Sequence, residues 1–86
     1  MTRNYVLTWL DMRRPLPPRS LRDRLTRAVD DQLPSPDAEL PAYLAQLGRT
    51  LLEGVVSKPA GGRELALDLL AADAFATYAF EAQADS

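Results

Sequence analysis

The sequence predicts an all-α protein, a small bundle of three main helices with a short N-terminal helix expected before them. Leu and Ala, with fifteen and thirteen copies, dominate the apolar residues and Ile is absent, which favours helix over sheet. Proline and glycine divide the 86 residues into four pieces, and apolar residues recur within them at helical spacing. The length suits one domain, which we expect to span residues 1–86.

The first piece, residues 4–13, is compatible with a helix and with a strand. Helical spacing places Tyr5, Trp9 and Met12 on one side, and Asn4 is a suitable N-cap residue. The same segment also has strong strand propensity. Strict alternation of apolar and polar residues is missing, so a short helix is favoured.

The second piece runs from about Pro18 to Leu33 and has the spacing of a helix. Proline suits the first turn of a helix, where its missing amide hydrogen is not needed, and Pro34 and Pro36 end the segment. One apolar stripe is surrounded by charged residues and consists of Leu21, Leu25, Ala28 and Val29.

The third piece begins between Asp37 and Pro41 and ends near Val56. Its apolar stripe is sustained over the whole length, with Leu52 and Val56 expected to broaden it, and consists of Leu40, Leu44, Leu47, Leu51 and Val55. Gly48 lies inside this helix. We interpret it as a tolerated glycine rather than as the mark of a close approach between helices.

The fourth piece, from Gly62 or Arg63 to about Ala82, has two apolar faces. The first comprises Leu65, Leu69, Ala72, Ala76, Ala79 and Phe80, and the second comprises Leu67, Leu70, Ala71, Ala74 and Tyr78. Two narrow seams separate the faces, one with Glu64, Asp68 and Phe75 and the other with Ala66, Asp73 and Thr77. A helix that is apolar on two sides is expected to be buried on two sides, as a central helix or against a second subunit.

Composition excludes most kinds of active site. The chain has no His and no Cys, so it has no Ser-His-Asp triad, no thiol nucleophile and no His- or Cys-bound metal. Glu64 and Asp68 are four residues apart and suit an oxygen-ligated divalent cation, but solvated or ion-paired carboxylates are favoured. We therefore expect no enzyme activity, no cofactor and no metal.

The net charge of −2 hides an uneven distribution: residues 1–30 carry net +4 and residues 31–86 carry net −6. An arginine-rich segment over residues 13–27 suggests a nucleic-acid face, although acidic residues interrupt it. The favoured interpretation is ion pairing between the two halves, because buried carboxylates in the last helix need partners. The candidates are Arg13, Arg14 and Arg22, pairing with Asp68 or Asp73, within or between subunits.

These observations favour a non-catalytic protein–protein interaction or scaffold module. We expect it to self-associate as a homodimer, or to bind another protein subunit, because the chain is small and has no disulfide to stabilise it. The expected interface residues are Tyr5, Trp9, Phe75, Tyr78 and Phe80. One alternative is a nucleic-acid-associated regulator that uses residues 13–27. A second alternative is a carrier of a small apolar ligand, lined by Leu69, Ala72, Ala76 and Phe80.

Two short segments of the chain contain patterns that are similar to known binding motifs. Residues 14–19 contain a PxxP core, which we interpret as a rigid elbow before the second helix. Residues 58–62 are rich in glycine but lack the Gly-Lys-Ser/Thr ending of a phosphate-binding loop.

Neither a membrane span nor a signal peptide is expected, and the abundance of Arg, Ala, Leu and Pro suggests a bacterial, cytoplasmic protein.

Overall fold

The computed structural model describes residues 1–57 and 62–85. Over these residues the chain contains helices and no strand, so the predicted all-α class is confirmed and the first piece is a helix. In this part of the chain the helices number four: α1 Arg3–Asp11, α2 Arg19–Asp31, α3 Leu40–Ser57 and α4 Arg63–Ala84.

The first two helices begin close to the predicted positions. The hydroxyl oxygen of Thr2 accepts the amide hydrogen of Tyr5 at 3.1 Å and caps α1. The predicted cap, Asn4, is wrong because this residue already lies inside the helix. Pro18 takes the N-cap position of α2, where the missing amide hydrogen costs nothing, and α2 ends before Pro34.

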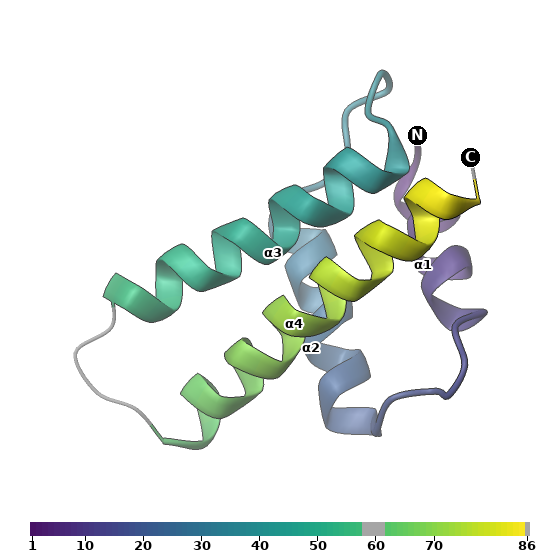
Figure 1. Ribbon diagram of the computed structural model, residues 1–86. Coiled ribbons are helices and arrows are strands. Elements are labelled where there is room, and N and C mark those ends of the chain that lie inside the picture. Colours follow the sequence, from purple (N-terminus) through teal and green to yellow (C-terminus); the bar gives the residue numbers. More distant parts are fainter. Residues whose placement is uncertain (58–61, 86) are drawn as a thin grey trace.

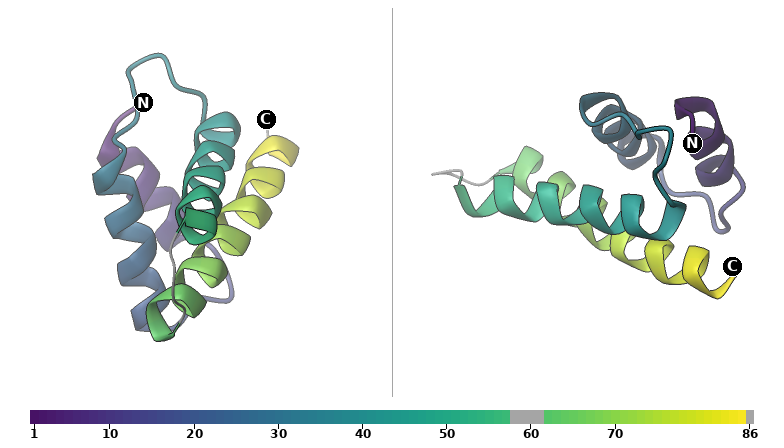
Figure 2. Two further views of the ribbon diagram at one scale, coloured as in Figure 1. Left: turned by 90° about the vertical axis from the view of Figure 1, so that its left-hand side faces the viewer. Right: turned by 90° about the horizontal axis from the view of Figure 1, so that it is seen from above.

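The helices form two layers. Helices α3 and α4 run antiparallel and make the most extensive contact in the molecule (Figure 1). Helices α1 and α2 lie together on one side of this pair, as both views in Figure 2 show. The opposite side of the α3–α4 pair is not covered by another described helix.

The core fills the space between the two layers. Its largest side chains are fully buried and come from all four helices: Val6, Val29, Leu44, Leu47 and Phe75. The predicted stripe of α3 is only partly correct, because Leu52 and Val56 do not broaden the buried face. They are 49% and 85% exposed, respectively, since their register turns them away from α1 and α2.

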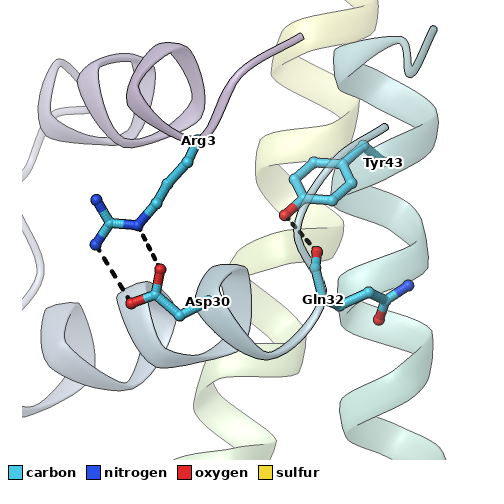
Figure 3. Close-up of polar contacts among 4 residues, drawn as sticks. All are labelled: Arg3, Asp30, Gln32 and Tyr43. Carbon is cyan, nitrogen blue, oxygen red and sulfur yellow. Dashed lines mark hydrogen bonds and ion pairs between the residues drawn. The ribbon is translucent and has the colours of Figure 1, made fainter. Parts of the chain in front are cut away.

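Polar contacts at one end of the bundle tie α1 to α2, and α2 to α3 in the other layer (Figure 3). The guanidinium of Arg3 binds the carboxylate of Asp30 and so ties α1 to α2. The hydroxyl of Tyr43 on α3 donates to the backbone carbonyl of Gln32 at 2.8 Å. Burial, and secondarily the negative charge of Asp30, raises the pKa of Tyr43 to about 12.

The connection between α3 and α4 includes most of the predicted glycine-rich loop. Residues 58–61 lie outside the described residues. Gly62 adopts a φ of +123°, a backbone conformation that favours glycine, at the start of α4. In the part of the chain that the structure describes, no helix is long and apolar enough to cross a membrane.

Candidate functional site

The buried stripe of α4 does not lie where the sequence analysis placed it. The buried residues are Asp68, Ala71, Ala72, Phe75 and Ala82, which share one side of the helix. Asp68 and Phe75 had been assigned to a narrow seam between two apolar faces, and this seam is the centre of the core contact. The two predicted faces are the flanks of the buried stripe, and the first of them borders α3.

Gly48 allows α3 and α4 to approach closely. A Cβ atom at this position would lie 3.2 Å from the carbonyl oxygen of Ala72 and 3.4 Å from the Cβ atom of Phe75. The sequence interpretation of Gly48 as a merely tolerated glycine was therefore wrong. Such contacts are tighter than most Cβ contacts in proteins, so a side chain at this position would push the two backbones apart by a few tenths of an ångström.

A groove follows the line where α3 and α4 meet on the uncovered side of the molecule. It has a volume of about 570 Å³. We call it the outer groove and define it by its lining residues: Pro41, Ala42, Ala45, Gly48, Arg49, Leu52, Ala72, Ala76, Ala79, Phe80 and Gln83. Alanines on both helices and Gly48 on α3 line it, and their small side chains leave the space that forms the groove.

The outer groove has two large apolar side chains and little polar chemistry. Phe80 on α4 is 80% exposed, and Leu52 on α3 is about half exposed. Arg49 is the charged residue of the lining, which holds no carboxylate and no hydroxyl among the described residues. Such a surface suits apolar contact, and this lining holds no side chain that commonly serves as a catalytic acid, base or nucleophile.

The predicted interface residues lie in different environments. Phe75 is completely buried, so its assignment to an interface was wrong: it packs beneath Gly48 and belongs to the core. Trp9 and Tyr78 pack edge to face within the chain, with ring centroids 6.0 Å apart. Tyr5 is exposed on α1 and borders a separate hollow beside Leu40. Phe80 lies on the outer groove.

The predicted ion pair forms with a different arginine. The buried Asp68 binds Arg24, whose Nε atom lies 2.6 Å from the carboxylate oxygen, and not Arg13, Arg14 or Arg22. Both side chains are nearly buried, at 10% and 6% exposure. Asp73, the other predicted carboxylate, is exposed on α4.

Several arginines of the predicted nucleic-acid segment are occupied inside the protein. Arg24 binds Asp68 in the core. The Arg13 guanidinium stacks on Trp9, with 3.9 Å between Cζ and the ring centroid. Arg14 donates to the carbonyl oxygens of Asp11 and Arg13, both at 2.9 Å. Arg14, Arg19, Arg22 and Arg27 nevertheless remain exposed.

The carboxylates do not gather into a metal site in the described part of the chain. There, no three acidic side chains come close enough together to hold an ion. Glu64 is exposed, whereas Asp68, four residues later, turns into the core. The two carboxylates that had been considered as cation ligands therefore differ in burial, although they are four residues apart on α4.

The sequence predicted only some of the residues that line the outer groove. Ala72, Ala76 and Phe80, three of the four residues predicted to line an apolar ligand site, do line it, and Leu69 does not. The contribution of α3 was missed, although Gly48 was a signal for close packing. Comparisons of the chain with protein-family models, with curated proteins and with solved structures found no match.

Proposed function

We propose that this protein is a non-catalytic, self-associating interaction module that docks a second copy of itself through the outer groove. The observation that supports the proposal is that Phe80, a large aromatic side chain, is 80% exposed. It lines an apolar groove on the side of the α3–α4 pair that no other described helix covers. Contiguous apolar surface of this kind marks interaction sites on soluble proteins. Each square ångström of apolar surface removed from water contributes about 25 cal/mol, which favours covering the groove.

The size of the face is of the same order as the area that a stable dimer of small subunits buries. Helix α3 has 18 residues and is about 27 Å long. Two helices side by side are about 20 Å wide, because helix axes lie 8–10 Å apart and side chains extend beyond them. The face therefore covers about 500 Å² in projection, and more in accessible surface. Stable complexes bury about 800 Å² of accessible surface on each partner.

The composition supports the same proposal. A chain of 86 residues without cysteine has no disulfide to stabilise its small core, so association is a source of additional stability. The absence of cysteine also suits the reducing bacterial cytoplasm, where we expect the protein to work.

The volume of the groove favours a second candidate function. At about 570 Å³ it falls within the range of small-molecule sites, and its lining is mostly apolar. A carrier would bind an apolar ligand in the same place. Native mass spectrometry of the purified protein distinguishes the two functions, because a carrier retains a ligand mass on a single chain and a dimer doubles the chain mass.

Sedimentation equilibrium between about 1 and 200 μM tests the proposal. We expect a dimer, and we expect Phe80→Glu to weaken it by about thirtyfold, as for an aromatic residue at the centre of an interface. Leu33→Glu is the matched control, because Leu33 is 61% exposed and lies outside the groove. A monomer at 200 μM, or equal effects of the two variants, contradicts the proposal.

A further inference from the structure

We propose that the dimer is two-fold symmetric about an axis along the outer groove, with α3 of each copy on α4 of the other and Arg49 facing Asp73 of the partner subunit. This inference rests on the proposed function, because it names the residues that select and orient the second copy. It follows from the positions of large, small and charged side chains along the two helices.

The contact at Gly48 shows which residues of α3 and α4 lie side by side. We call two residues level, or at the same height, when they have the same position along the direction of the helix pair. A Cβ atom on Gly48 would meet both Ala72 and Ala76, so Gly48 lies between these two residues of α4. Because the helices are antiparallel, each step forward along α3 is a step back along α4 (Figure 1). Arg49 is therefore level with Asp73 to within about one turn.

The same count places a large side chain of α4 beside small ones of α3. Phe80 of α4 is level with Ala42 and Ala45 of α3, and all three residues line the outer groove. Leu52 of α3 is instead level with the exposed residues Leu69 and Leu70 of α4. A second copy rotated by 180° about the groove axis keeps each residue at the same position along the helices. It brings Phe80 onto the small residues of α3 of the other copy, where there is space for it.

Charge decides between this arrangement and the other two-fold packing. An axis across the groove would place α3 on α3, and where such an axis crosses α3 near Arg49 it would bring Arg49 of both copies together, so that they repel. An axis along the groove places Arg49 over α4 of the other copy, which carries Asp73 at the same height. Arg49 and Asp73 are both exposed, and among the described residues neither takes part in an ion pair within its own chain.

Charge reversal tests the pairing. We expect Arg49→Asp and Asp73→Arg each to weaken the dimer about tenfold, since each creates two like-charge contacts per dimer. The double variant Arg49→Asp/Asp73→Arg is expected to return within about threefold of the original. Arg19→Asp, an exposed change of the same charge at the start of α2, is the control and should leave the dimer unchanged.

Disulfide trapping tests the arrangement by a second route, because the chain has no native cysteine. Ala45→Cys and Ala76→Cys proteins, one of them labelled with ¹⁵N, are mixed and oxidised, and the cross-linked pairs are weighed. We expect mixed pairs to exceed like pairs several-fold.

The outcomes separate the two proposals. A dimer that forms mainly like pairs, or that the double charge reversal fails to restore, overturns this arrangement and leaves self-association standing. A protein that stays monomeric by sedimentation overturns both.

Discussion

Arg24 on α2 binds Asp68 on α4 across the interior of the protein, with 2.6 Å between Nε and Oδ1. The two residues are 44 positions apart in the chain. The arginine comes from the positively charged N-terminal part and the aspartate from the negatively charged remainder. Burying either charge alone would cost several kcal/mol, so the pair links the position of α2 to the register of α4.

Removing the guanidinium tests this link. We expect Arg24→Met to lower the free energy of unfolding by about 3 kcal/mol, because it removes the arginine partner of a buried carboxylate. Urea denaturation followed by circular dichroism measures the change. Arg27→Met, at an exposed position of the same helix, is the control and should change stability by less than 0.5 kcal/mol, as is usual for surface sites. Equal effects of the two variants would show that the pair does not stabilise the fold.

The two glycines of α3 provide a matched comparison. Gly54→Ala should stabilise the protein by about 0.5–1 kcal/mol, since alanine is the better helix former and no atom lies within 4 Å of the new methyl group. Gly48→Ala should destabilise it, because its Cβ atom would press against the backbone of α4 at 3.2 Å. Thermal unfolding of both variants measures the difference. Equal stabilisation by both substitutions would disprove the close approach.

Tyr43 joins α3 to the end of α2 through a single hydrogen bond. We expect Tyr43→Phe to cost about 1 kcal/mol, because the substitution keeps the buried ring but removes the donor to the Gln32 carbonyl. Tyr5→Phe, at an exposed tyrosine, serves as the control in the same urea titrations. If the two phenylalanine variants are equally stable, the hydrogen bond contributes nothing to the fold.

Arg3 and Asp30 give the protein a contact that depends on pH. The hydrogen bond from Arg3, and after it the attraction between the charges, lowers the pKa of Asp30 below its ordinary value. A lowered pKa in the folded state means that the contact stabilises the fold above about pH 4 and is lost as the pH falls through the folded-state pKa.

Arg3→Ala is therefore expected to raise the pKa of Asp30 toward its ordinary value, as measured by NMR titration of the carboxyl carbon. Arg14→Ala leaves the Asp30 contact in place and should leave this pKa unchanged. An unchanged pKa of Asp30 in Arg3→Ala would show that Arg3 is not its partner in solution.

The helices and the breaks between them could be predicted because their causes are local. Pro18 and Pro34 restrict the backbone wherever they occur, and the stripe of Leu44, Leu47 and Leu51 has the period of a helix without reference to any neighbour. The preference of residues 4–13 for helix over strand was also correct. Here Thr2, which lies before that segment, supplies the cap.

The face that α4 buries depended on the tertiary structure. Leucine and alanine occur on almost every side of this helix, so its periodicity left several orientations possible. Asp68 is a carboxylate that solvent would normally attract, and it is buried because Arg24 reaches it from another helix. Which segments are helical follows from local properties of the chain, since propensity and periodicity act over a few residues. Which side of α4 belongs to the core and which side forms the outer groove depends on contacts between residues far apart in the chain, so it became visible in the folded structure.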